Sequence, residues 1–163
     1  MTRSKDSAEW GAYEPKKLSA KGLKFGIVVS RYHPMIGQRL LDGALRYLEE
    51  KGGRQKEIKT FFVPGAFEIP LMLKALAESE QYDALIALGV VIKGETAHFD
   101  YVAGESSSGI ARVASDDGIP VGFGLLTVLS EEQALARAGG AAGNKGEEAA
   151  AAALEMIYRL DEV

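Results

Sequence analysis

The sequence has no cysteine and only two histidines, and this scarcity removes several kinds of functional site from consideration. Without cysteine there can be no disulfide framework, no thiolate metal site and no cysteine nucleophile. Two histidines are few for a zinc site. The motifs GxGxxG, HExxH and GxSxG are also absent, so dinucleotide-binding, zinc-protease and serine-hydrolase functions lack their characteristic residues. We therefore expect no metal site.

Long apolar runs and basic stretches are missing as well. No run approaches the roughly 20 apolar residues that a membrane helix needs, and residues 1–14 are polar and mixed in charge, unlike a signal peptide. The net charge of −4 comes without a long basic stripe, which argues against nucleic acid as the main partner. We expect a soluble, cytoplasmic protein with neither a membrane nor a nucleic-acid partner.

The length and composition indicate a single globular domain. The 163 residues fall within the range of about 100 to 200 that is usual for one domain, and contents of 47% hydrophobic and 26% charged residues exclude a disordered chain. We expect residues 1–17 to form a loosely held arm and residues 18–163 to form one α/β domain. Whether the arm adds to a neighbouring subunit is left open by the sequence.

Strand and helix patterns alternate along the chain. The apolar and β-branched runs predict four strands, at 24–30, 58–63, 84–92 and 121–126. Helical spacing predicts helices at 35–52, 68–77, 99–115, 131–138 and 145–160. Repeated strand–helix units predict a parallel sheet with right-handed crossovers, hence a three-layer, doubly wound domain. For the four strands we expect the flavodoxin-like order 2-1-3-4. Ligands in such folds lie beyond the carboxyl ends of the strands, so the site is expected in segments 30–34, 64–68, 92–98 and 126–130.

The segment 93–100 follows the most apolar strand and begins a helix. Gly94 permits close approach of a ligand to the backbone, Thr96 supplies a hydroxyl, and amides at a helix start favour an anion such as phosphate. His98 beside them could carry protons, because imidazole titrates near neutral pH. The residues leave open the alternative that Thr96 only caps the helix and His98 is a surface residue of its first turn.

Two other strand ends carry polar residues with weaker signals. His33 precedes Pro34 in a turn that accepts many polar residues, and no second metal ligand is near it, so a structural role is favoured. Glu68 could accept hydrogen bonds from sugar hydroxyls, and Phe67 could form a pocket wall. An acidic residue in a first helical turn also complements the helix dipole, and this second interpretation of Glu68 is slightly favoured.

The glycine-rich segment 139–146 is similar to a phosphate-binding loop only at first sight. Asn144 stands where the Walker pattern has glycine before Lys145, and Gly146 replaces its serine or threonine. A flexible connector between two helices is therefore favoured. Arg137, just before this segment, is either an anion ligand, since its planar guanidinium suits phosphate, or a solvated surface arginine.

Five segments, in this order, resemble the lumazine synthase family. They are FGIVVSRY at 25–32, VPGAFEIP at 63–70, LGVVIKGETAHFDY at 88–101, EQAxxRAG at 132–139 and GNKG at 143–146. The resemblance implies condensation of 5-amino-6-(D-ribitylamino)uracil with 3,4-dihydroxy-2-butanone 4-phosphate, which gives 6,7-dimethyl-8-ribityllumazine. This is the penultimate step of riboflavin biosynthesis, and the resemblance implies that it needs no cofactor.

The same resemblance implies a role for each site residue. His98 would transfer protons, Tyr32 would stack on the uracil ring, and Phe123 from the adjacent subunit would close the pocket. The other expected contacts are Ala66, Phe67 and Glu68 with the ribityl chain, Val90, Val91 and Ile92 with the pyrimidine edge, and Glu95 (through its backbone), Thr96 and Arg137 with the phosphate.

The chain departs from the family pattern at two places. Tyr32 stands where phenylalanine or tryptophan is common, but a tyrosine ring should stack equally well. Residues 128–130 are more apolar than is usual in the family. The resemblance also implies a homo-oligomer built from pentamers, and the short 139–146 connector favours a hollow 60-subunit shell. Riboflavin synthase is a candidate partner.

Two other functions stay open. A non-catalytic carrier of a flavin or ribityl ligand would need stacking and ribityl contacts, but neither a proton carrier nor a phosphate clamp. A shell-forming relative could have a structural role that outweighs its activity. His98 and Arg137 distinguish the enzyme from the carrier.

Overall fold

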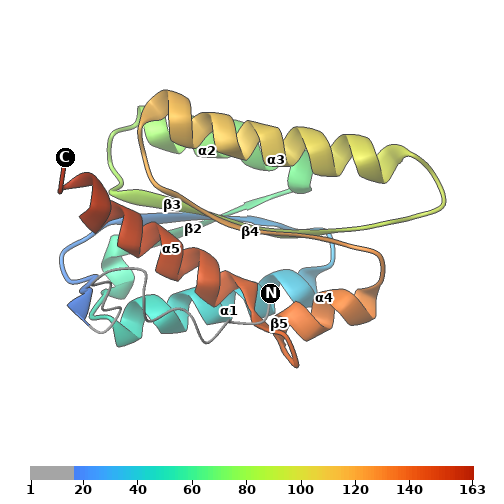
Figure 1. Ribbon diagram of the computed structural model, residues 1–163, viewed down its shortest axis with the longest axis horizontal. Coiled ribbons are helices and arrows are strands. Elements are labelled where there is room, and N and C mark those ends of the chain that lie inside the picture. Colours follow the sequence, from blue (N-terminus) through green and yellow to red (C-terminus); the bar gives the residue numbers. More distant parts are fainter. Residues whose placement is uncertain (1–16) are drawn as a thin grey trace.

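A four-stranded parallel sheet forms the centre of the computed structural model, which describes residues 17–163 (Figure 1). The strands are β1 (Phe25–Ser30), β2 (Ile58–Val63), β3 (Ala84–Ile92) and β4 (Val121–Val128), and they lie in the order β2-β1-β3-β4. All three pairings are parallel. The predicted sheet and strand order are therefore confirmed. The arm predicted at 1–17 lies, apart from its last residue, outside the described residues.

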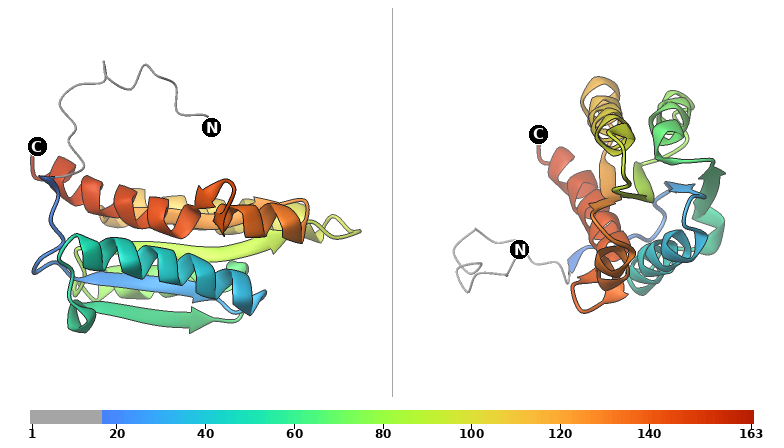
Figure 2. Two further views of the ribbon diagram at one scale, coloured as in Figure 1. Left: turned by 90° about the horizontal axis from the view of Figure 1, so that it is seen from below. Right: turned by 90° about the vertical axis from the view of Figure 1, so that its right-hand side faces the viewer.

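Helices cover both faces of this sheet and complete the three predicted layers. One face carries α1 (Pro34–Glu50), α4 (Glu131–Arg137) and α5 (Lys145–Leu160), and the other carries α2 (Ile69–Glu78) and α3 (His98–Asp117) (Figures 1 and 2). All six residues of β1 are buried, because its side chains alternate between two apolar layers. Ile27 and Val29 pack toward α1 and α5, whereas Val28 packs toward α2 and α3.

Several strands and helices begin or end at other residues than predicted, and some of these differences affect the site. β4 runs two residues further than expected, to Val128, because Val128 still pairs with Ile92 of β3. The helix expected at 68–77 is two elements, a 3₁₀ turn at Ala66–Glu68 and then α2. Pro70 lies in the first turn of α2, where its missing N–H costs no helical hydrogen bond. α3 starts one residue earlier than expected, which makes His98 its first residue.

The segment after α4 forms a small hairpin rather than the flexible connector that was expected. β5 (Ala138–Gly140) pairs antiparallel with β6 (Gly143–Asn144), and α5 begins directly after Asn144. The backbone amides and carbonyls of these short strands bond to each other, which a simple connector would leave to solvent. A further 3₁₀ turn, Gln55–Glu57, precedes β2.

Among the helices of residues 17–163, none combines the length and the apolar composition that crossing a membrane requires.

Candidate active site

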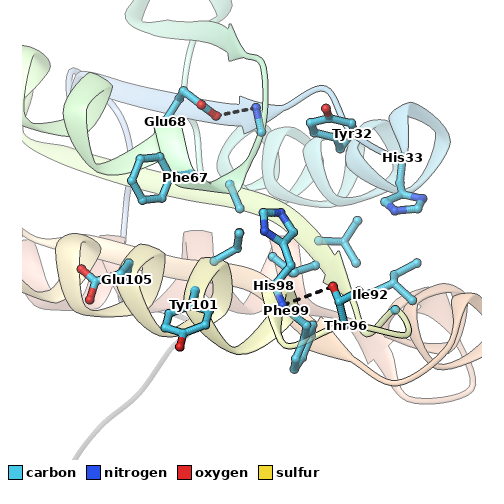
Figure 3. A pocket seen from close by; sticks show the side chains of 16 residues that line it. Tyr32, His33, Phe67, Glu68, Ile92, Thr96, His98, Phe99, Tyr101 and Glu105 are labelled. Carbon is cyan, nitrogen blue, oxygen red and sulfur yellow. Dashed lines mark hydrogen bonds between the residues drawn. The ribbon is translucent and has the colours of Figure 1, made fainter.

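A cavity of about 690 Å³ lies beyond the carboxyl ends of β1 and β3, where the fold predicts ligand binding (Figure 3). Three segments form most of its wall: the turn after β1, the turn after β2, and the end of β3 with the start of α3. The residues that line it are Tyr32, His33, Gly65, Ala66, Phe67, Glu68, Val90, Val91, Ile92, Gly94, Thr96, His98, Phe99, Tyr101, Val102 and Glu105.

Tyr32 and Gly65 form one wall together. The Tyr32 side chain is 70% exposed, yet its ring lies so close to Gly65 that a Cβ there would be 2.9 Å from the Tyr32 Cδ2 atom. Glycine at position 65 therefore lets an aromatic ring rest against backbone. A flat aromatic face at the mouth of a cavity can stack on a planar ligand.

Glu68 has a local structural partner and also faces the cavity. Its Oε2 atom accepts a hydrogen bond from the Gly65 amide at 2.9 Å, which fixes the turn that carries Ala66 and Phe67. The carboxylate therefore satisfies a backbone donor just before the 3₁₀ turn. This is a structural role at a helix start, the kind of role that the sequence slightly favoured for Glu68. Because Glu68 is also part of the cavity wall, the two interpretations do not exclude each other.

The end of β3 forms the floor of the cavity. Val90 is 3% exposed and is buried like the six strand residues before it, whereas Val91 and Ile92 are half-buried. The strand continues into the loop through a bond from the Lys93 amide to the Val128 carbonyl at 2.9 Å. Val90, Val91 and Ile92, which were predicted to contact the pyrimidine edge, all line the cavity.

The loop after β3 brings Gly94, Thr96 and His98 to the same cavity. The His98 amide donates to the Thr96 Oγ1 atom at 3.4 Å, and both residues are exposed. Figure 3 shows the His98 imidazole pointing from the start of α3 toward the turn that carries Phe67. Thr96 thus bonds to a helix-start amide, as the structural alternative supposed, but only over a long distance. The start of the 20-residue α3 also directs its positive dipole end toward this region.

His33 has a larger part in the site than the sequence suggested. It precedes α1 in a left-handed conformation, with φ of 55°, and its carbonyl accepts bonds from the amides of Ile36 and Gly37 at 3.1 Å each. This is the structural turn that was favoured, but His33 also lines the cavity. Within residues 17–163, no group of three or more histidine, aspartate or glutamate side chains could hold a metal ion.

Four residues of α3 that the sequence analysis did not single out also line the cavity: Phe99, Tyr101, Val102 and Glu105. Tyr101, Val102 and Glu105 follow His98 at intervals of three, four and seven residues. Residues at this spacing share one face of a helix. Helical periodicity counted from His98 would therefore have predicted three of the four.

Three predicted site residues do not line the cavity of a single copy of residues 17–163: Glu95, Phe123 and Arg137. Glu95 is exposed in the loop between two lining residues. Phe123 is 50% exposed on the edge strand β4, and Arg137 ends α4, where its Nη1 atom donates to the Gln133 carbonyl at 3.0 Å. Neither Phe123 nor Arg137 therefore contributes to the cavity that is formed by the same chain.

Comparison with known proteins shows which family has this sequence. The family model described as 6,7-dimethyl-8-ribityllumazine synthase matches residues 22–161. A protein of that name from Syntrophus aciditrophicus is 52% identical over 147 residues, which cover 90% of this chain and 96% of the relative. One from Nitratidesulfovibrio vulgaris strain DP4 is 50% identical over 147 residues, covering 90% and 94%. The chain therefore belongs to the 6,7-dimethyl-8-ribityllumazine synthase family.

Proposed function

We propose that this protein condenses 5-amino-6-(D-ribitylamino)uracil with 3,4-dihydroxy-2-butanone 4-phosphate to 6,7-dimethyl-8-ribityllumazine, with release of inorganic phosphate and water. One structural observation supports this proposal in addition to family membership. Tyr32, Glu68, Thr96 and His98 come from three separate segments, and all four line one cavity.

The uracil and its ribityl chain would occupy the part of the cavity between the first two segments. Tyr32 offers an aromatic face held against Gly65, on which the uracil ring would stack. Ala66 and Phe67 would contact the ribityl carbons, and Glu68, whose Oε2 is bound to the Gly65 amide, would accept from ribityl hydroxyls through Oε1.

The pyrimidine edge would lie over the floor formed by Val90, Val91 and Ile92. Val91 and Ile92 are half-buried and lie beyond Leu88, the last residue of β3 that pairs with β1. A strand end offers both amide donors and carbonyl acceptors, which suits the alternating donors and acceptors of a uracil edge.

The phosphate would lie at the start of α3. The Glu95 backbone amide and the Thr96 hydroxyl would donate to it there, and the helix dipole favours an anion at this end. Arg137 would supply the positive charge. Because Arg137 does not line the cavity of its own copy, we propose that the arginine comes from a neighbouring subunit.

His98 would move protons between the reacting atoms. The substrate amine is already a nucleophile and the ketone an electrophile, so correct orientation can supply up to about 7 to 11 kcal/mol. Attack by the amine, loss of water and departure of phosphate each require a proton to be moved. A histidine at the cavity mouth would contribute about 10² to 10⁴-fold to the rate.

The same proposal requires an oligomer. Phe123 would come from the adjacent subunit to close the pocket, in a homo-oligomer of pentamers that forms a 60-subunit shell. Large apolar side chains are exposed around the cavity, including Tyr32, Phe67 and Tyr101, and such patches are typical of protein–protein contacts. Riboflavin synthase is a candidate partner of the shell, and we propose a cytoplasmic location for this protein. Light scattering tests the size of the assembly, and cell fractionation tests the location.

The test of the proposed reaction is lumazine formation, followed by absorbance, from the two purified substrates. We expect turnover in buffer with no added cofactor. Binding of a ribityl ligand without turnover would support the carrier instead. Assembly of a shell without turnover would support a structural role.

A further inference from the structure

Arg137 is the last residue of a helix that is too short to fix its own position. α4 has seven residues, Glu131–Arg137, and helices of this length are not stable in isolation. The last turn of a helix also tends to fray, because its carbonyls lack helical partners. The place of the Arg137 guanidinium therefore depends on the contacts that hold the end of α4.

The hairpin of β5 and β6 holds that end. Ala138, the residue after Arg137, is 2% exposed and pairs with Asn144. The Ala142 amide at the hairpin tip donates to the Ala136 carbonyl of α4 at 2.8 Å. Figure 1 shows β5 beside both α4 and α1, and the hairpin packs on both helices.

Asn144 anchors the hairpin to the rest of the fold. Its Nδ2 atom donates to the Arg39 carbonyl of α1 at 3.0 Å. Its Oδ1 atom accepts from the amides of Gly146 and Glu147 at 2.8 and 3.1 Å, which caps α5. The side chain lies directly over Gly43 of α1, where any Cβ would collide with it. Both polar ends of the Asn144 amide are therefore bonded, to two different helices.

We propose that Asn144 is a positioning residue for the phosphate site, because it ties the hairpin to α1 and thereby fixes Arg137 at the end of α4. This inference rests on the proposed function of Arg137 as a phosphate ligand. Asn144 does not line the cavity of its own copy, and both polar atoms of its side chain are already bonded within the fold, so its effect on the reaction is transmitted through Arg137. The competing explanation is that Asn144 is only the cap of α5.

Two substitutions separate the cap from the tie to α1. Asn144→Ser keeps an oxygen that can cap α5 but is too short to donate to the Arg39 carbonyl. Asn144→Ala removes both functions. Arg46→Ala is the matched control, since the exposed Arg46–Glu147 ion pair, at 3.9 Å, also joins α1 to α5 but does not involve the hairpin.

The measurement is steady-state kinetics of the assembled enzyme with each substrate varied in turn. We expect Asn144→Ser to raise the KM for the butanone phosphate by about three- to tenfold, the usual effect of one lost hydrogen bond. In Asn144→Ser, the kcat and the KM for the ribitylaminouracil should stay within about twofold of their original values. In the control Arg46→Ala, the kcat and the KM values for both substrates should stay within that range. An unchanged KM for the butanone phosphate in Asn144→Ser, or equal increases for both substrates, would overturn the proposal.

A double-variant cycle tests whether Asn144 acts through Arg137. In an Arg137→Ala background, Asn144→Ser should cause no further rise in this KM, because the residue that it positions is gone. A further rise of similar size would overturn the proposal. If Arg137→Ala raises the KM and Asn144→Ser does not, the positioning role alone is wrong. If Arg137→Ala has no effect, the proposed phosphate site is wrong as well.

Discussion

Gly65→Ala should weaken binding of the ribitylaminouracil without unfolding the protein. The added Cβ would lie 2.9 and 3.1 Å from two atoms of the Tyr32 ring and 3.2 Å from the Glu68 Oε2 atom. The backbone φ of Gly65 is −146°, which alanine adopts without strain. The conflict is therefore with the ring, and an exposed ring can turn away.

The size of the effect follows from what Tyr32 would contribute. Loss of aromatic stacking costs about 0.5 to 1.5 kcal/mol, which corresponds to a rise of about two- to twelvefold in the KM for the ribitylaminouracil. The KM for the butanone phosphate should not change. The free energy of unfolding should change by less than about 1 kcal/mol, because the displaced ring is already exposed.

The assay is steady-state kinetics together with thermal unfolding. Gly104→Ala is the matched control, since Gly104 lies in α3 and, apart from its chain neighbours and the backbone of its own helix, nothing described lies within 4 Å of a Cβ there. The reasoning is refuted if Gly65→Ala leaves the KM for the ribitylaminouracil unchanged. It is also refuted if Gly65→Ala weakens binding further when Tyr32 is already alanine, because the effect would then not act through the ring.

Four further outcomes follow from the site and the fold. His98→Ala should lower kcat by about 10² to 10⁴-fold without abolishing turnover, because orientation of the substrates remains; complete loss in single-turnover kinetics would contradict a role limited to proton transfer. Arg137→Ala should raise the KM for the butanone phosphate by about 10- to 100-fold, the range of a charge-assisted hydrogen bond, and an unchanged KM would exclude it as a phosphate ligand. Tyr158→Phe should lower the free energy of unfolding by about 1 kcal/mol in urea titrations, since the Tyr158 hydroxyl donates to the Ser19 carbonyl at 2.6 Å and accepts from its amide at 3.1 Å; no change would mean that water replaces both bonds. Dialysis against a chelator should leave the rate of lumazine formation unchanged, and a loss that zinc restores would show that a metal takes part.

Local sequence patterns were sufficient to predict the four strands, but not where each of them ends. The apolar run at 84–92 lacks alternation, and this distinguishes a strand that is covered on both faces; β3 has these bounds and its first seven residues are buried. The end of β4 was missed because Val128 belongs to the strand only through its pairing with Ile92. Local propensity carries no information on such a pairing.

The site was predicted in part, and the reasons differ from residue to residue. The fold brings Thr96 and His98 to the cavity because they follow a central strand, which the sequence could show. For His33 a structural role was favoured, since nothing in a His-Pro turn indicates which way the imidazole points. The hairpin at Ala138–Asn144 was missed because its pairing depends on contacts with α1, such as the bond from Asn144 to the Arg39 carbonyl.

The central claim is that one active site combines the cavity of one copy with Arg137 of another. Subunit complementation tests it most directly: His98→Ala and Arg137→Ala chains are mixed in one assembly, and lumazine formation is measured at a low concentration of butanone phosphate. If sites are shared, about one quarter of them in a random equal mixture regain both residues, so the activity should rise well above the sum of the two separate variants. Activity equal to that sum would show that His98 and Arg137 serve the same copy, and would contradict the claim.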